Sequence, residues 1–178
     1  TLLTEAGANI ALAAPTGRAA KRMSELCGRE AKTIHRLLEV EWGEGDRPIF
    51  KRDEKNPLDY DVIITDELSM MDVQLFASLL KAMTVNCRLI LVGDVDQLPS
   101  VGAGNVLGDL ISSGIVPTVR LSQVFRQSKQ SLIVVNAHRI INGEMPIIDK
   151  ESDFFVVNAK SGQAAATLAC DLYCERLK

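Results

Sequence analysis

Short apolar runs alternate with stretches of helical spacing through the first two thirds of the chain. Because strands that alternate with helices pack as a parallel sheet with helices on both faces, this order predicts an α/β fold. Ligands of such a sheet bind at the edge where its strands end. The predicted strands are Asn9–Ala14, Asp61–Thr65, Arg88–Val92 and Thr118–Leu121, and the predicted helices are Arg18–Leu26, Thr33–Val40, Asp72–Met83 with Asp72 as N-cap, and one from the Gly102–Gly104 turn to Ser113.

Two parts of the chain depart from this alternation. Glu41–Pro57 is rich in charge, glycine and proline, which predicts an exposed loop or a small hairpin. Beyond Arg126 the sequence predicts a helix at Leu132–Ile141, a short strand at Phe154–Val157 and a long amphipathic helix at Gly162–Leu177. We therefore expect two domains, residues 1–125 and residues 126–178, the second being the start of another domain or a tail that wraps around the first.

Composition narrows the class of protein. Of the 178 residues, 47% are apolar and 24% are charged, as in an ordinary soluble globular protein. The net charge of −3 gives no sign of a globally basic nucleic-acid binder, although a motor can concentrate positive charge in one channel. Four scattered cysteines favour a reducing compartment. No apolar run approaches a membrane span of about 20 residues, and no signal peptide opens the chain, so we expect a cytoplasmic protein without membrane contact.

The first candidate site is a pair of carboxylates, Asp66 and Glu67, directly after the apolar strand Asp61–Thr65. A strand that ends in this way can direct one carboxylate toward a phosphate-bound Mg²⁺, and the other can orient or deprotonate an attacking water. Adjacent acids after a strand also occur as simple turn chemistry, so the pair gains weight only from the motif that follows.

That motif is the run Val92-Gly93-Asp94-Val95-Asp96-Gln97-Leu98-Pro99, directly after the next apolar strand. The Gln97 amide can hydrogen-bond a γ-phosphate or the lytic water, and hydrolysis can then move loops that hold DNA. The alternative is a polar loop closed by a proline. Two strand-tip motifs separated by one helix favour a nucleotide site.

Two further motifs carry polar groups at the start of a predicted helix: Pro15, Thr16, Gly17 and Arg18, which suit a phosphate of a nucleic-acid backbone, and Thr33, His35 and Arg36, which offer a hydroxyl, an imidazole and a guanidinium. The first lies between a strand and a helix, where exposed amides at the helix N-terminus suit an anion. The alternative is a plain turn with Thr16 as N-cap. By itself, His35 is more typical of a capping or surface residue.

Two other signals are weaker. Arg126, in Phe125-Arg126-Gln127, could bring a cation to a γ-phosphate, where charge builds in the transition state. Cys170 and Cys174 share one side of a predicted helix, but neither histidine has metal-ligand spacing to them. We expect these two cysteines to be small buried residues and not metal ligands.

Together these motifs resemble the RecD/TraA-type superfamily 1 DNA helicases. The matching segments are Ala14-Pro-Thr-Gly-Arg-Ala-Ala-Lys-Arg-Met, Thr33-Ile-His-Arg-Leu-Leu, Asp66-Glu-Leu-Ser-Met, Val92-Gly-Asp-Val-Asp-Gln-Leu-Pro-Ser-Val-Gly-Ala-Gly-Asn, Leu121-Ser-Gln-Val-Phe-Arg-Gln, Leu132-Ile-Val-Val-Asn-Ala-His-Arg-Ile and Gly143-Glu-Met-Pro. The resemblance covers roughly residues 1–146. It implies a RecA-like P-loop NTPase core, truncated at the N-terminus: most of the first motor domain and the beginning of the second.

The resemblance also implies roles for matching residues: Asp66 holds Mg²⁺, Glu67 activates water, Gln97 senses the γ-phosphate of ATP, Arg126 touches that phosphate, and Pro15, Thr16, Gly17, Arg18, Thr33 and His35 meet single-stranded DNA. The implied activity is ATP-driven 5′→3′ movement along single-stranded DNA that separates the duplex at junctions. Recombination, repair or conjugation is its setting, and subunits of such complexes are candidate partners.

The family's phosphate-binding loop, which ends in Gly-Lys-Ser or Gly-Lys-Thr, has no counterpart here, and the chain does not begin with methionine. Leu68 also stands where a small residue is expected. We therefore expect a piece of a longer protein, with a gap in the middle of its sheet and no ATP hydrolysis or unwinding on its own. A non-catalytic DNA-binding scaffold with a RecA-like fold stays open as the alternative, and a small P-loop enzyme such as a nucleotide kinase is a third reading.

Overall fold

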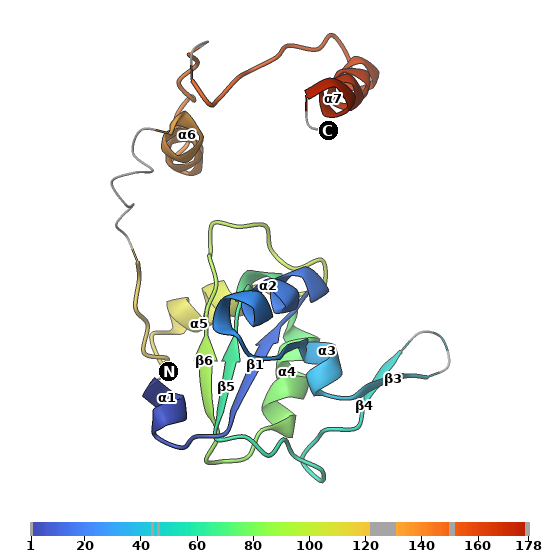
Figure 1. Cartoon of the computed structure of the whole chain (residues 1–178), viewed down its shortest axis with the longest axis vertical. Helices are drawn as coiled ribbons and strands as arrows, with labels where there is room; N and C mark the ends of the chain where they lie inside the picture. The colour runs from blue at the N-terminus through green and yellow to red at the C-terminus, as the bar shows by residue number, and fades with distance from the viewer. Residues whose placement is uncertain (1, 44, 46, 122–130, 150–151, 177–178) are drawn as a thin grey trace. The chain divides into compact units, whose positions relative to one another are not determined.

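Four parallel strands form the main sheet in the order β2-β1-β5-β6 (Figure 1). They are β1 (Ile10–Ala14), β2 (Ala31–Thr33), β5 (Val62–Thr65) and β6 (Arg88–Leu91). β1 and β5 are unbroken apolar runs until the final threonine of β5, as parallel strands covered on both faces require. The predicted α/β fold with a parallel sheet is confirmed.

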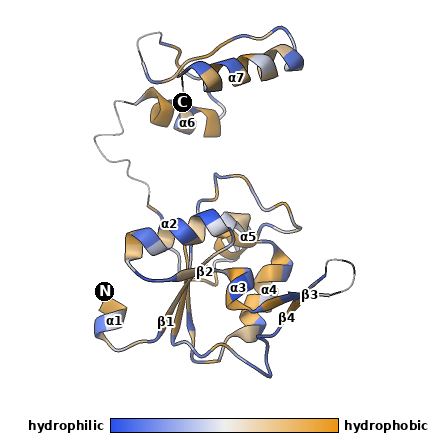
Figure 2. Cartoon of the chain, turned by 45° about the vertical axis from the view of Figure 1, so that its right-hand side comes forward, coloured by the Kyte–Doolittle hydropathy of each residue, from blue (hydrophilic) through white to orange (hydrophobic). Residues whose placement is uncertain are grey.

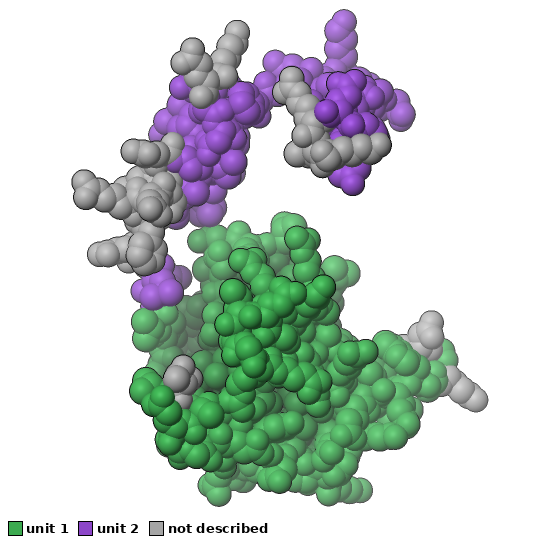
Figure 3. All heavy atoms as spheres, viewed as in Figure 1, with its two compact units in different colours: residues 1–119 green, residues 120–178 purple. Residues whose placement is uncertain are grey.

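The computed structural model describes residues 2–43, 45, 47–121, 131–149 and 152–176. They belong to two units, Thr1–Val119 and Arg120–Lys178 (Figure 3). The remaining elements of the first unit are α1 (Leu2–Glu5), α2 (Gly17–Cys27), α3 (Ile34–Leu37), the hairpin strands β3 (Val40–Trp42) and β4 (Pro48–Phe50), the 3₁₀ helix η1 (Leu68–Met70), α4 (Val73–Ala82) and α5 (Val106–Ser113). The predicted boundary between residues 125 and 126 lies outside the described residues.

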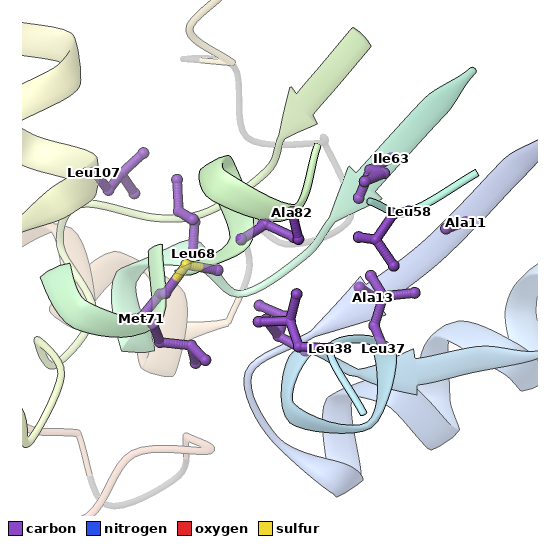
Figure 4. Packing of buried hydrophobic residues seen from close by; sticks show 13 residues of the cluster. Ala11, Ala13, Leu37, Leu38, Leu58, Ile63, Leu68, Met71, Ala82 and Leu107 are labelled. Atoms are coloured by element: carbon purple, nitrogen blue, oxygen red, sulfur yellow. The ribbon is translucent and has the colours of Figure 1, made fainter. Parts of the chain in front are cut away.

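The apolar core of the first unit lies on the face of the sheet that carries Ala13 and Ile63. Buried side chains of α3, α4, α5 and η1 pack against this face (Figure 4). Side chains alternate along a strand, so Ala14 points to the opposite face, where α2 packs and buries Ala20. Helices therefore cover both faces, as predicted.

Local capping explains where the helices begin. The Asp72 carboxylate accepts a hydrogen bond from the backbone N–H of Leu75 (2.8 Å), which makes it the N-cap that the sequence predicts for α4. In the same way, Thr16 caps α2, and α2 ends at Gly28, whose φ of 62° is the left-handed conformation that glycine adopts without strain.

The predicted gap in the middle of the sheet is wrong. β1 pairs directly with β5, and β5 pairs directly with β6, so the described strands form one unbroken ladder. Within this sheet β6 is an edge strand, and its apolar Ile90 is 40% exposed. Any additional strand of this sheet must pair at an edge, beside β2 or β6, and not between the described strands.

Four other local predictions are also wrong. Thr118–Leu121 and Phe154–Val157 are not strands, and the helix predicted from Thr33 to Val40 is only the four-residue α3. The strand β2 before it was not predicted, because Ala-Lys-Thr has no apolar alternation of its own and is extended through its pairing with β1. Cys170 and Cys174 are exposed, whereas the sequence predicts burial.

The second unit is built on α6 (Leu132–Ile141), which is coloured mostly as hydrophobic in Figure 2, and contains α7 (Gly162–Arg176). The side-chain amide of the buried Asn136 donates to the carbonyl of Ile147 and accepts from its N–H, both at 2.7 Å. Asp153 accepts from the backbone N–H groups of Leu132 (2.7 Å) and Ile133 (3.3 Å) at the start of α6. Side chains thus hold the segment that follows α6 onto this helix. None of the helices in the described ranges is long and apolar enough to cross a membrane.

Candidate functional site

The carboxyl ends of all four strands meet at one edge of the sheet. The register pairs Ala14 with Thr33, and Thr65 with both Ala13 and Leu91. The two motifs expected to meet a nucleic-acid backbone therefore follow β1 and end β2, on one half of this edge. The acidic pair and the glutamine loop follow β5 and β6, on the other half.

The acidic pair occupies a tight turn at the tip of β5. The backbone N–H of Asp66 donates to the Ala13 carbonyl at 3.0 Å, which extends the ladder with β1 by one residue. The Asp66 carboxylate accepts from the backbone N–H of Glu67 at 2.9 Å. Glu67 has φ 56° and ψ 40°, a left-handed conformation that residues other than glycine rarely adopt. Such strain often marks functional positions, and both side chains are only partly buried.

The loops after β5 and β6 are bonded to each other. The Leu68 N–H donates to the Val92 carbonyl at 3.0 Å, and the Val92 N–H donates to the Thr65 carbonyl at 2.8 Å. A Cβ at Gly93 would lie only 2.9 Å from the Leu107 side chain and 3.1 Å from the Leu68 nitrogen. Gly93 therefore allows the glutamine loop to lie directly against the acidic loop.

The glutamine loop is anchored at its far end as well. The Val73 N–H donates to the Ala103 carbonyl at 3.0 Å, at the start of α4. Between the two anchors, the Asp94 carboxylate accepts from the N–H of Asp96 at 3.0 Å, and Gln97 is exposed. The loop thus presents Gln97 to solvent from a fixed base. Arg126, the other residue expected at a γ-phosphate, lies outside the described residues.

Both threonines on the other half of the edge are helix caps. Thr16 Oγ1 accepts from the N–H of Ala19, and Thr33 Oγ1 accepts from the N–H of Arg36, each at 3.2 Å. The capping interpretation of Thr16 is therefore correct for the free chain. A capping hydroxyl uses its oxygen as acceptor and keeps its O–H to donate, so a phosphate contact is compatible with the cap.

The other residues that are expected to contact a nucleic-acid backbone differ in their solvent exposure. Gly17 and Arg18 are exposed, and Pro15 is half-buried. The half-buried His35 lies with its ring centroid 6.0 Å from that of Phe50 in β4, at an interplanar angle of 49°. His35 thus packs beside the hairpin as well as at the start of α3.

A hollow of about 430 Å³ is lined by residues of both motifs that are expected to contact a nucleic-acid backbone. Its lining is Gly17, Ala20, Lys21, Glu30, Ala31, Lys32, Thr33 and Arg36. Sequence reasoning did not identify Lys21 or Lys32 as site residues. The signal available for Lys21 was its position four residues after Gly17, on the same face of a helix.

Two observations bear on a metal ion at the acidic pair. Mg²⁺ is commonly held by one or two carboxylates together with substrate phosphates, a donor set that Asp66 and Glu67 fit. Two buried hydroxyls beside them, Thr65 Oγ1 and Ser69 Oγ, have no hydrogen-bond partner among the described residues. In that part of the chain no group of three or more histidine, cysteine or acidic side chains forms an all-protein metal cage.

The AAA domain family matches residues 1–103 of the chain. The ATP-dependent RecD2 DNA helicase of Deinococcus radiodurans is 44% identical over 140 residues, which are 79% of this chain and 19% of that protein. The RecBCD enzyme subunit RecD of Mycobacterium tuberculosis is 45% identical over 118 residues, 57% of this chain and 20% of that protein. The chain thus spans about a fifth of the length of these curated relatives.

Among solved structures, Bacteroides Pif1 bound to single-stranded DNA aligns with a TM-score of 0.55. The alignment covers 98% of this chain and 48% of that chain, at 19% identity. At this identity the likeness speaks for the fold alone, and it supports the RecA-like α/β core.

Proposed function

Because the chain belongs to the AAA domain family and is of the RecD type of superfamily 1 helicases, we propose that it is part of an ATP-driven DNA motor. The observation that carries this proposal is the pair of bonded loops at the carboxyl edge, which present Asp66, Glu67 and Gln97 from neighbouring strands. In the whole protein the activity is ATP hydrolysis coupled to unwinding of duplex DNA.

In the proposed reaction, a water attacks the γ-phosphorus of ATP opposite the leaving ADP oxygen. The Glu67 carboxylate orients this water and accepts its proton, and Gln97 hydrogen-bonds the γ-phosphate or the water. Asp66 is the residue to hold Mg²⁺, which supplies charge neutralisation at the phosphates when bound. Arg126 is proposed to stabilise the charge that builds on the γ-phosphoryl group.

Thr16, Arg18, Thr33 and His35, on the other half of the edge, are proposed to bind single-stranded DNA. The DNA backbone is proposed to lie close to Pro15 and Gly17. Gln97 lies in a loop that is hydrogen-bonded to the acidic loop and to the start of α4. A movement of Gln97 on loss of the γ-phosphate is therefore passed on to these two packed elements. We propose movement in the 5′→3′ direction, action at single-strand/duplex junctions, and a cytoplasmic role in recombination, repair or conjugation.

The test is ATP hydrolysis by the whole protein with and without single-stranded DNA, comparing wild type with Glu67→Gln. The variant removes the proton acceptor but keeps the size of the side chain. We expect DNA-stimulated turnover in wild type and a loss of about 100-fold or more in the variant, with nucleotide binding retained.

Glu54→Gln is the matched control, because Glu54 is an exposed acid in the loop before β5. It should leave turnover unchanged. Full turnover by Glu67→Gln contradicts the assignment of the base. DNA binding without any stimulated hydrolysis in wild type favours the alternative, a non-catalytic scaffold.

A further inference from the structure

Positive charge from three different elements converges on the hollow beside the carboxyl edge. Lys21 comes from α2, Lys32 from β2 and Arg36 from α3, while the only acid in the described lining is Glu30. The packing of α2 and of α3 against β2 brings the backbone positions of the three residues to the same hollow.

These cations are weakly neutralised. Lys21 Nζ lies 4.0 Å from a Glu25 oxygen and Lys32 Nζ lies 4.0 Å from a Glu30 oxygen, both at the outer limit of an ion pair. The Lys21 side chain is 81% exposed, and exposed pairs of this kind contribute little. No ion pair to Arg36 is found within the described ranges. The charge is therefore available to an external anion.

A second hollow of about 360 Å³ shares Lys32 and Arg36 but has a different balance of charge. Its lining includes Glu39 and Asp59, and its own arginine, Arg52, donates to Glu39 at 2.7 Å. Lys32, Arg36 and Arg52 therefore face two acids there, whereas the three cations of the first hollow face only Glu30 among the described lining residues. The excess of positive charge is larger in the first hollow.

We propose that Lys21, Lys32 and Arg36 bind the sugar-phosphate backbone of single-stranded DNA, as a continuation of the contacts expected at Gly17 and Thr33. The inference rests on the proposed function and adds a path for the strand. Gly17 and Thr33 line the same hollow as the three cations, so a strand at the two backbone motifs passes directly over it. Gly17 has open space above its Cα, which lets a backbone approach closely. Three separated cations suit successive phosphates.

The experiment is a titration of the 178-residue chain against a fluorescent oligothymidylate, followed by anisotropy at several salt concentrations. The variant is Lys21→Gln/Lys32→Gln/Arg36→Gln. Each lost phosphate contact lowers the salt dependence of single-strand binding, the slope of log K against log salt, by about 0.7. We expect the variant to lose about 2 in this slope and to bind at least about tenfold more weakly at low salt.

The control variant carries the same change in charge at three exposed positions outside the hollow, Lys55→Gln/Lys81→Gln/Arg47→Gln. It should keep the wild-type slope, and both variants should keep the wild-type circular dichroism. Equal losses in the two variants overturn the inference, because they indicate a general charge effect.

Three further outcomes also overturn it, and they differ in meaning. If wild type and the hollow variant bind DNA with the same slope, the inference fails while the proposed function stands. If wild type does not bind the oligonucleotide at all, the inference fails, and the hydrolysis assay of the whole protein decides the proposed function separately. Displacement of the oligonucleotide by millimolar inorganic phosphate would assign the hollow to a small anion and reject a strand path.

Discussion

Gly93 lets the loops after β5 and β6 lie in close contact because it has no side chain. Alanine there places a methyl group 2.9 Å from the Leu107 side chain and 3.1 Å from the Leu68 backbone nitrogen. Backbone on one side and packed core on the other leave little freedom to adjust. We expect Gly93→Ala to lower the free energy of unfolding by about 1–3 kcal/mol, measured by urea denaturation.

Gly17→Ala is the control for this substitution, because a Cβ at Gly17 meets nothing within 4 Å. Its effect on stability should be neutral or favourable by up to about 1 kcal/mol. A Gly93→Ala variant as stable as wild type would show that the two loops are not closely packed in solution.

For single residues, the sequence predicted the site where the residue type and its position after a strand together favour one kind of chemistry. Asp66, Glu67 and Gln97 were placed correctly at neighbouring strand tips, because acidic and amide groups directly after apolar strands stand out. Lys21 and Lys32 were not identified, because exposed lysines are common and only the folded arrangement brings these two to one hollow. The left-handed backbone of Glu67 likewise has no signature in the sequence.

Among the elements, α6 depends on a carboxylate 21 residues away from its first residue. A hydrogen bond from the Ser131 hydroxyl lowers the pKa of Asp153, and the N–H groups of Leu132 and Ile133 add to this effect. The folded state therefore favours the charged form of Asp153. The resulting stability is present above the unfolded pKa near 3.8 and is lost as the pH falls through the lowered value.

We therefore expect the Asp153 carboxyl to titrate below 3.8 when its NMR shift is followed against pH. Ser131→Ala should move this pKa upward, and Asp153→Asn should weaken α6 at neutral pH and remove this contribution to the pH dependence. A pKa at or above the ordinary value in wild type contradicts the capping role.

Helices were easier to predict than strands for a physical reason. α4 and α6 carry apolar residues at helical spacing and a capping side chain, all of it local information. A strand depends on a neighbour: Ala31–Thr33 is extended because it pairs with β1, while the β-branched residues of Phe154–Val157 have no such partner in the described part of the chain.

The whole molecule divides its charge unevenly along the carboxyl edge. The loops after β5 and β6 carry Asp66, Glu67, Asp94 and Asp96, whereas Lys21, Lys32 and Arg36 lie beside the half formed by β1 and β2. The sequence has no Gly-Lys-Ser or Gly-Lys-Thr loop to neutralise the β- and γ-phosphates. Because the charges of these acidic loops repel ATP⁴⁻, the loops alone are a poor site for ATP.

For this reason we expect the 178-residue chain by itself neither to hydrolyse ATP nor to unwind DNA. The measurement is phosphate release with Mg²⁺ and single-stranded DNA, together with separation of a forked duplex. The whole protein, assayed in parallel, is the positive control. Robust hydrolysis by the isolated chain would show that the described carboxylates suffice without that loop.

The left-handed turn at Glu67 sets stability against function at a single position. A side chain in this conformation stores on the order of 1 kcal/mol of strain, and glycine would relieve it. Selection for thermal resistance alone therefore favours loss of the carboxylate, and selection for the turnover proposed above opposes it. Variants recovered from a purely thermal screen should accumulate inactive replacements at position 67, and consensus design that scores only foldability would remove the proposed catalytic base.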